Sequence, residues 1–289
     1  MSIQHILVPT DFSHPAMKAV HYAARLAEAL GARLTLLHVC NTGRMHYHLS
    51  WASTGLHVEE MAEDEDARTR LQRLASPLNA RGVQTHVAVV GPAETIPSIL
   101  EAATHADVVV LASQTWTGRQ PDEESISIAI AHEAPCPVLL VDVATSLRTT
   151  GLLVLVPTDL SEASAVALRL ARELTAALGG RVEVVHALPD ASEAATWGGE
   201  PVEADDDLPE ARRHRYLERF VEAAGGALVP IELRLVEGPP VDAIARVAQE
   251  DHPDLVVVGR PADRPDAPDS LLDAAMAAAP CPTLRAPSP

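Results

Sequence analysis

The architecture is specified by a short stretch near the start of the chain, His5-Ile-Leu-Val-Pro-Thr-Asp-Phe-Ser13, because that stretch occurs twice. It returns as Leu153-Val-Leu-Val-Pro-Thr-Asp-Leu-Ser161, with Asp11 and Asp159 separated by 148 residues. Each copy is an apolar run of strand length that ends in proline, threonine and aspartate. A repeat of this kind predicts that each copy forms its own structural unit.

Three further blocks recur in the same order at nearly constant offsets. Val90-Gly-Pro92 corresponds to Glu237-Gly-Pro239, Ala106-Asp-Val-Val-Val110 to Pro253-Asp-Leu-Val-Val257, and Ala134-Pro-Cys-Pro137 to Ala279-Pro-Cys-Pro282. The offsets and the length of 289 residues predict two domains, residues 1–146 and 151–289, joined by a polar turn.

Each copy alternates short apolar runs with helical patterns, which is typical of a parallel α/β sheet. In the first copy we expect strands at about 3–9, 33–40, 84–90, 108–112 and 138–143, with helices at about 16–30, 59–78, 93–103 and 125–133. In the second copy the later helices are expected at about 208–224, 241–249 and 270–278. The predicted fold is two tandem open parallel five-stranded sheets flanked by helices.

The charge balance excludes several classes of partner. With 22 basic and 40 acidic residues the formal charge is −18, which repels phosphate backbones and anionic lipid, so we expect no nucleic-acid and no membrane partner. The three widely spaced cysteines favour neither a disulfide framework nor a zinc site and fit a reducing cytoplasm. The N-terminus lacks a basic export signal, and no apolar run approaches the length of a membrane span.

Motifs for catalysis and for common cofactors are missing from the sequence. There is no G-x-S-x-G elbow, no G-x-G-x-x-G and no P-loop motif, so we expect a protein that is not an enzyme. The tightest histidine cluster, His46-Tyr-His48 with His57, has no acidic or cysteine ligand at a fixed short spacing, and we expect no metal.

Asp11 and Asp159 stand where a ligand site is expected, since open parallel sheets bind ligands beyond the carboxyl ends of their strands. A carboxylate there could accept hydrogen bonds from a base or a ribose, with Pro9-Thr10 and Pro157-Thr158 shaping the wall. It could equally cap the helix that follows, and the spacing alone leaves both interpretations open.

Together these motifs resemble the universal stress protein family. The resemblance rests on the two Val-Pro-Thr-Asp segments, on Leu37-His38-Val39 and Val185-His186-Ala187, and on the two Ala-Pro-Cys-Pro motifs, so it covers essentially the whole chain. It implies a Rossmann-like fold of the adenine nucleotide alpha hydrolase type, a cytoplasmic stress-response role and, in some members, a site for ATP or AMP.

Family members that bind ATP carry a glycine-x2-glycine-x9-glycine-serine (or threonine) loop after the fourth strand. In the first copy Ala112 and Thr115 stand at the first two glycines, whereas the second copy has Gly259 followed by Ala262. The glycine scaffold is therefore mostly lost. Three aspartates follow Gly259 and would oppose a polyphosphate unless a cation intervened, namely Asp263, Asp266 and Asp269. The residues to which the resemblance assigns a nucleotide site are Pro9, Thr10, Asp11, Val39, Ala112 and Ser125 in the first copy, and Pro157, Thr158, Asp159, Ala187, Gly259 and Ser270 in the second.

Two function classes follow. The first is a stress-associated regulatory module that works through an unidentified protein partner and has lost tight ATP binding, and loss of glycines favours it. The second is an adenine-nucleotide sensor with an atypical loop in one or both domains. We also expect the two domains to form an intrachain pseudo-dimer through their final strands, and a homodimer remains an open alternative.

Overall fold

The computed structural model describes residues 3–41, 56–113, 126–141, 148, 151–188, 210–225, 228–260 and 281–287. Contacts between Cα atoms divide the chain into two compact units, residues 2–138 and 139–289. Each unit is described by itself.

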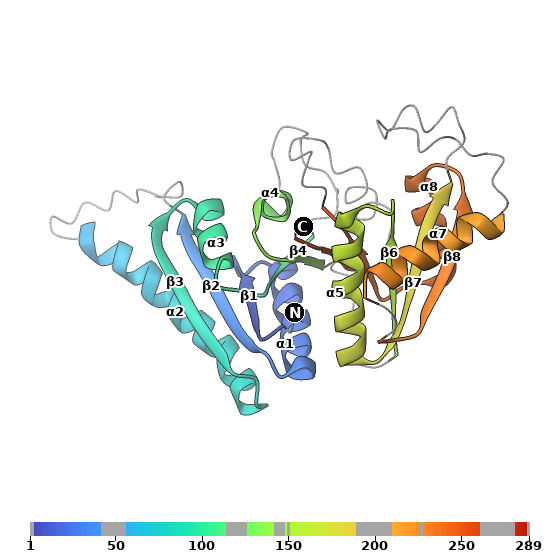
Figure 1. Cartoon of the computed structure of the whole chain (residues 1–289). Coiled ribbons are helices and arrows are strands. Elements are labelled where there is room, and N and C mark those ends of the chain that lie inside the picture. The colour runs from blue at the N-terminus through green and yellow to red at the C-terminus, as the bar shows by residue number, and fades with distance from the viewer. Residues whose placement is uncertain are drawn as a thin grey trace. The chain divides into compact units, whose positions relative to one another are not determined.

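The first unit alternates strands and helices as the sequence predicts (Figure 1). Its elements are β1 (His5–Pro9), α1 (His14–Leu30), β2 (Arg33–Asn41), α2 (Leu56–Ala80), β3 (Thr85–Ala93), α3 (Thr95–Ala103), β4 (Val108–Ala112), α4 (Ile126–Glu133) and the start of β5 (Val138–Val141). The strand that was expected to end at Val90 continues through Gly91-Pro92 to Ala93, and α3 begins correspondingly later, at Thr95.

The second unit repeats this order. Its described elements are β6 (Leu152–Pro157), α5 (Glu162–Leu178), β7 (Gly180–Leu188), α7 (Glu210–Ala223), β8 (Ile231–Glu237), α8 (Pro240–Asp251), β9 (Leu255–Val258) and β10 (Thr283–Arg285). The helix expected at 270–278 lies outside the described residues.

The two units have equivalent strand orders. The first runs β3-β2-β1-β4 with β5 next, and the second runs β8-β7-β6-β9-β10. The pairs β1–β2 and β6–β7 are parallel, as are β1–β4 and β6–β9. Because β1 lies between β2 and β4, the chain changes direction across the sheet at β1 and β4, and at β6 and β9 in the second unit. The predicted class of fold is confirmed, and these two positions are its topological switch points.

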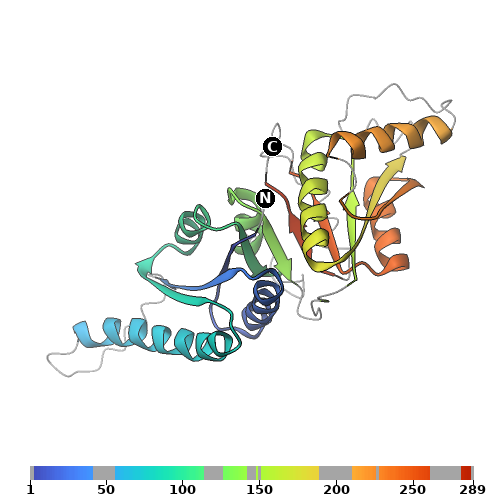
Figure 2. The same cartoon turned by 60° about the horizontal axis from the view of Figure 1, so that its bottom comes forward.

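Helices cover both faces of each sheet. In the first unit α1 and α2 lie on one face and α3 and α4 on the other (Figure 2). In the second unit α5 and α7 lie on the face opposite α8. None of the described helices is both long enough and apolar enough to cross a membrane.

The core is built from the apolar runs that the repeat marks. Ile6, Val8 and Val109 are fully buried, and α1 turns Ala19 and Ala23 toward the strands. Gly31 ends α1 with a left-handed φ of 66°, a conformation that glycine adopts at little cost. In the second unit Leu155 and Leu168 are also fully buried, and burying one such side chain contributes about 1.5–3 kcal/mol.

The recurring Asp-Val-Val block has a structural role at the amino ends of the strands. Asp107 Oδ2 accepts the backbone N–H groups of Gln4 (2.8 Å) and His5 (2.9 Å). Asp254 Oδ2 accepts the backbone N–H of Leu153 at 3.0 Å. Each carboxylate therefore ties the amino end of the fourth strand of its unit to the amino end of the first, which explains why the block repeats.

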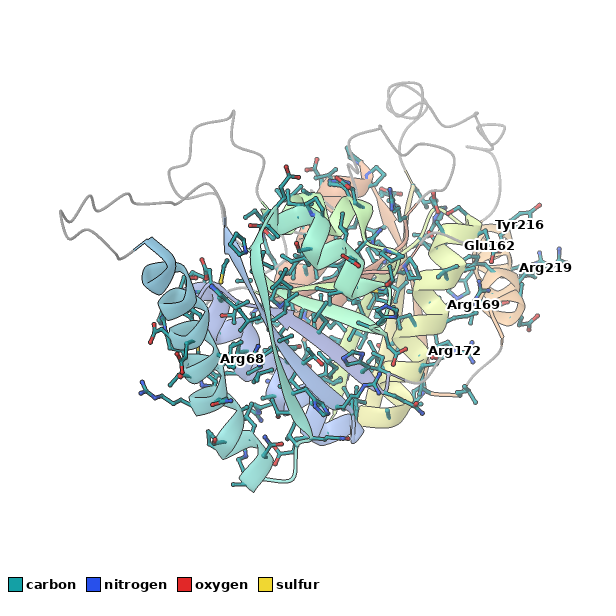
Figure 3. All side chains as sticks on the ribbon, turned by 90° about the vertical axis from the view of Figure 1, so that its left-hand side faces the viewer. Arg68, Glu162, Arg169, Arg172, Tyr216 and Arg219 are labelled. Atoms are coloured by element: carbon teal, nitrogen blue, oxygen red, sulfur yellow. The ribbon has the colours of Figure 1, made fainter. Side chains whose placement is uncertain are left out.

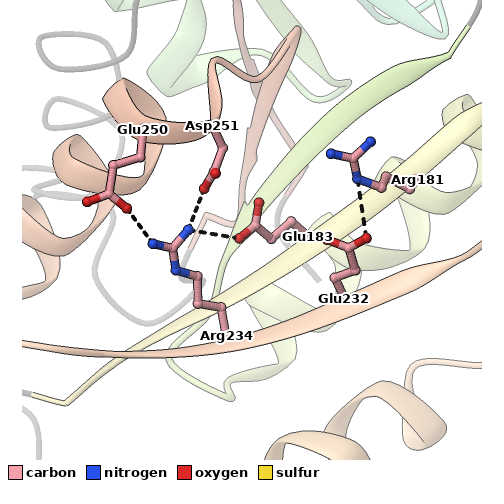
Figure 4. A network of polar contacts seen from close by, with 6 residues as sticks. All are labelled: Arg181, Glu183, Glu232, Arg234, Glu250 and Asp251. Carbon is pink, nitrogen blue, oxygen red and sulfur yellow. Dashed lines mark hydrogen bonds and ion pairs between the residues drawn. The ribbon is translucent and has the colours of Figure 1, made fainter.

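A charged network links the edge strand β8 to its neighbours (Figure 4). Arg234 on β8 binds Glu183 of β7 at 3.4 Å and also pairs with Glu250 and Asp251 of α8. Burial raises the pKa of Glu183, the charge of Asp251 raises it further, and Arg234 opposes both. This cluster of carboxylates surrounds its own cation, so its role is to hold α8 and the two strands together.

Candidate functional site

The two candidate sites lie at the switch points, where β1 and β6 end. Beyond Pro9 the Thr10 amide donates to the Leu37 carbonyl at 2.8 Å, and the Thr158 amide donates to Val185 at 2.9 Å. The strand pairing thus continues one residue past each proline. Both threonine side chains are part of a buried wall, since Thr10 and Thr158 are each 6% exposed.

A histidine on the neighbouring strand fixes each of these wall residues. His38 Nδ1 lies 2.7 Å from the Thr10 carbonyl, and His186 Nδ1 lies 2.8 Å from the Thr158 carbonyl. Because a carbonyl only accepts, Nδ1 carries a proton in both rings and donates it. Both histidines are half-buried and hydrogen-bonded.

The residue after the aspartate in each unit has an unusual backbone conformation. Phe12 has φ 63° and Leu160 has φ 65°, values that are uncommon outside glycine. Their amides donate to the preceding threonine hydroxyls, Thr10 Oγ1 at 3.1 Å and Thr158 Oγ1 at 2.9 Å. The turn brings the aspartate side chain back over the start of the helix.

The aspartates support the turn, and serines cap the helices. Asp11 Oδ1 accepts the Ser13 amide at 2.9 Å, and Asp159 Oδ1 accepts the Ser161 amide at 3.0 Å. Ser13 Oγ then accepts from the Ala16 amide at the first turn of α1. The sequence left open whether each aspartate caps the following helix or binds a ligand. In the structure Ser13 and Ser161 cap the helices. Oδ2 of Asp11 makes no hydrogen bond with any described residue, so it can accept one from a ligand.

The second unit adds a hydroxyl that the first lacks. Ser164 Oγ donates to Asp159 Oδ1 at 2.6 Å, whereas the equivalent position in the first unit is Ala16. Burial raises the pKa of Asp159, but hydrogen bonds from Ser161 and Ser164 outweigh it and hold that pKa below its usual value. Asp159 therefore stays ionised at neutral pH, and one of its oxygens already has two donors.

Gly259 lies against the start of α5. A Cβ at this position would lie 2.3 Å from the Ala163 carbonyl oxygen and 2.4 Å from its carbon, both too close for any side chain. The glycine is therefore required for packing between β9 and α5, whether or not a ligand binds nearby. Ala112 occupies the equivalent position at the end of β4 in the first unit.

Other predicted site residues lie one strand away or outside the described part. Val39 pairs with Val90 in the β2–β3 register, and Ala187 pairs with Val236 in β7–β8. Ser125 and Ser270 lie outside the described residues. Among the described residues no group of three His, Cys, Asp or Glu side chains could hold a metal. Of the predicted histidine cluster, His46 and His48 lie outside that part and His57 lies in the first turn of α2.

One feature of the first site was missed from the sequence. The Phe12 ring lies 4.8 Å from the His38 ring, and the Arg70 guanidinium lies 3.9 Å over the Phe12 ring from α2. A guanidinium at that distance over a ring makes a cation–π contact. The second unit has Leu160, 37% exposed, in place of Phe12. In the sequence, this difference between the two sites is indicated only by the replacement of Phe12 by Leu160.

The geometry defines a class, namely tandem open parallel α/β units, each with an Asp-centred turn at its switch point. A profile of the universal stress protein family matches residues 2–142 and 153–287. The chain belongs to the universal stress protein family and contains two tandem copies of its domain.

Two of the solved structures that match this chain share its fold. A universal stress protein from Archaeoglobus fulgidus DSM 4304 has a TM-score of 0.72 at 19% identity, with full coverage of both chains. A functionally unknown protein from Pseudomonas aeruginosa PAO1 has a TM-score of 0.62 at 18% identity, covering 99% of this chain and 92% of that one. A universal stress protein in complex with cAMP is 18% identical, with a TM-score of 0.39, and covers 50% of this chain and 100% of its own. No curated protein matches the chain.

Proposed function

We propose that this chain is a non-catalytic universal stress protein of the cytoplasm, which regulates by binding a protein partner and holds ATP weakly or not at all. Any residual affinity is for a less charged adenine compound such as AMP. The observation that carries the proposal is the loss of glycine where backbone should approach phosphate: Ala112 and Thr115 in the first copy and Ala262 in the second.

The size of this loss follows from the contacts that phosphate needs. A charge-assisted hydrogen bond contributes about 1.5–3 kcal/mol, so losing two or three weakens binding by several powers of ten. In the second copy Asp159 is held ionised, and Gly259 is already required by the packing of α5. The ionised carboxylate opposes a polyanion there, and the packing role of Gly259 means that this glycine is not evidence for a phosphate site.

A nucleotide sensor that uses the first copy alone is the second candidate. Asp11 supports it because, among the described residues, the Ser13 amide is the only donor to its carboxylate, which leaves acceptor capacity for an adenine amino group or a ribose hydroxyl. The Arg70 guanidinium over Phe12 also places a positive charge at this end of the unit.

Isothermal titration calorimetry with ATP and with AMP tests the proposal on the full chain, on Asp11→Ala and on Asp159→Ala. The control is Asp242→Ala, which removes an exposed carboxylate on α8 and leaves the residues of both turns unchanged. We expect no ATP binding in the micromolar range and, if AMP binds, loss of that heat in Asp11→Ala alone. Tight ATP binding that Asp11→Ala abolishes would establish the sensor instead. Release of phosphate or pyrophosphate from ATP, absent from a heat-denatured sample, would overturn the non-catalytic assignment.

A further inference from the structure

The guanidinium of Arg70 is held at the first turn without the use of its hydrogen-bond donors. Its central carbon lies 3.9 Å from the centroid of the Phe12 ring. Such a contact uses the charge of the guanidinium and leaves the N–H groups at its edge available to an anion. Arg70 is exposed and makes no hydrogen bond or ion pair with any described residue. The first unit therefore presents an oriented cation whose donors are free.

The Phe12 ring on which Arg70 lies is itself fixed to the turn. The Phe12 amide donates to Thr10 Oγ1 at 3.1 Å, and the Phe12 ring lies 4.8 Å from the His38 ring. His38 Nδ1 in turn donates to the Thr10 carbonyl at 2.7 Å. These contacts restrict the ring and so restrict the guanidinium above it. A group that is oriented before binding loses less conformational entropy when an anion arrives.

The carboxylate of Asp11, the residue before Phe12, supplies a second group for a ligand. Asp11 is exposed, and its Oδ1 accepts the Ser13 amide while its Oδ2 makes no hydrogen bond with any described residue. A carboxylate accepts hydrogen bonds from hydroxyl or amino groups, whereas a guanidinium donates them to phosphate. An acceptor and a cation at one turn suit a ligand that carries both hydroxyl groups and a phosphate.

The second copy has different side chains at the equivalent positions. Leu160, 37% exposed, occupies the position of Phe12, so the second turn offers no aromatic ring there. Ser164 Oγ donates to Asp159 Oδ1 at 2.6 Å, a bond that the first copy lacks because its residue there is Ala16. The backbone of the turn is common to both copies, so the fold does not require an arginine over a ring at this place.

The charges around Arg70 limit how many phosphate groups a ligand can carry. Asp66 is exposed one turn earlier on α2, and neither Asp66 nor Asp11 forms an ion pair with Arg70. Both carboxylates, together with the formal charge of −18, repel each added phosphate. One guanidinium offers paired N–H groups to one phosphate. A monophosphate therefore gains from Arg70, while the further phosphates of a triphosphate mainly add repulsion.

We infer that Arg70, held over Phe12, binds the phosphate of a phosphate monoester whose ribose hydroxyl groups bind Asp11 in the first copy. A nucleoside monophosphate and a ribose phosphate share this chemistry. The inference rests on the proposed function, because it identifies the residue that holds the phosphate of the residual ligand of the first turn. It also explains a preference for a less charged ligand, since a single cation serves a single phosphate.

Isothermal titration calorimetry of the full chain with AMP, adenosine and ribose 5-phosphate, at about 50 mM salt, tests the inference. The variants are Arg70→Gln and Phe12→Leu, which installs the residue of the second copy. The matched control is Arg68→Gln, which removes the same charge from an exposed position of the same helix (Figure 3). We expect wild type and Arg68→Gln to bind AMP at least ~10-fold more tightly than adenosine. Arg70→Gln should abolish this ratio and Phe12→Leu should reduce it, while the adenosine affinity stays unchanged.

The ratio of AMP to adenosine affinity decides the inference, and ribose 5-phosphate identifies the source of the phosphate. Affinity for ribose 5-phosphate equal to that for AMP assigns the site to a sugar phosphate, and a weaker affinity assigns it to a nucleotide. A ratio near one in wild type, a ratio that Arg70→Gln leaves intact, or one that Arg68→Gln lowers equally overturns the inference. Absence of all binding also overturns it, but leaves the proposal of weak or absent ATP binding standing. Micromolar ATP binding that persists in Arg70→Gln overturns that proposal instead.

Discussion

Ser164→Ala tests whether the second turn is built around an ionised Asp159. The substitution removes the 2.6 Å hydrogen bond from Ser164 Oγ to Asp159 Oδ1 and the 3.3 Å hydrogen bond that Ser164 Oγ accepts from the Asp159 amide. It keeps the Ser164 amide, which donates to Ser161 Oγ at 3.2 Å. The backbone tolerates alanine here, because Ala16 occupies the equivalent position in the first unit. The perturbation is therefore confined to one hydroxyl.

The expected cost follows from the charge on the acceptor. Hydrogen bonds to charged groups contribute about 1.5–3 kcal/mol. Because Asp159 is only partly buried, this one lies at the lower end, about 1.5 kcal/mol. Ser164 itself is 4% exposed, so water replaces the lost hydroxyl only on the carboxylate side. The matched control is Ser98→Ala on α3, where the lost hydroxyl bonds only to the Glu94 carbonyl, and we expect a cost of a few tenths of a kcal/mol.

The cost should depend on pH in a defined direction. Because the folded pKa of Asp159 lies below its unfolded value of about 3.9, this group stabilises the fold above about pH 4 and loses that contribution as the pH falls through the folded pKa. Burial raises the pKa, and Ser164→Ala removes one of the hydrogen bonds that outweigh burial. The difference between wild type and variant should be largest at neutral pH and shrink below about pH 4.

Urea unfolding at about pH 7, 5 and 3.5, together with hydrogen exchange of the first amides of α5, measures this difference globally and locally. A cost that is the same at all three pH values would show that the hydroxyl acts through packing rather than through the carboxylate. No cost at pH 7 would show that the short contact between Ser164 and Asp159 contributes nothing.

Three further outcomes are expected. Arg172→Met should lower the free energy of unfolding by about 3 kcal/mol, measured by urea unfolding, because the carbonyls of Ala224 and Gly225 lose their donors; a cost under about 1 kcal/mol would contradict that role. Gly259→Ala should cost about 1–3 kcal/mol in the same assay, since the new Cβ would overlap the Ala163 carbonyl, and a neutral result would show that α5 can move aside. Added salt should raise the thermal midpoint by screening the charge of −18, so a midpoint that stays flat or falls up to physiological ionic strength would refute self-repulsion.

The repeat made the strands and the switch points predictable, because apolar runs and turn residues are encoded locally. The positions of Asp11 and Asp159 follow from that frame alone. The identity of the helix cap did not follow, since Asp11 and Ser13 are two residues apart and both are good caps. Whether the aspartate or the serine caps the helix depends on the residue between them, which has a left-handed backbone conformation. Neither phenylalanine nor leucine is a residue type that indicates a positive φ.

Contacts between distant segments could not be predicted from sequence patterns. The Arg172 guanidinium meets the Ala224 carbonyl across 52 residues, and Arg70 reaches Phe12 only because α2 packs beside the end of β1. The position of Arg172 beside the buried Ala171 of α5 is a weak indication that its side chain has hydrogen-bond partners, because a charged side chain is seldom buried without them. Those partners come from a segment more than 50 residues away in sequence, so they can be identified only once the fold brings the two segments together.

The two turns show how one backbone frame supports different chemistry. Wall threonine, left-handed residue and Asx-type turn match between the copies to within about 0.2 Å in their hydrogen bonds. The side chains differ, because Ser164 donates to an oxygen of Asp159, while Ala16 leaves Asp11 with one donor among the described residues. Since the backbone is common, any difference in ligand affinity between the copies must arise from these side chains and from the loops after β4 and β9. Ala16→Ser should therefore reduce whatever adenine binding the first turn has, and an AMP affinity unchanged by that substitution would place the binding elsewhere.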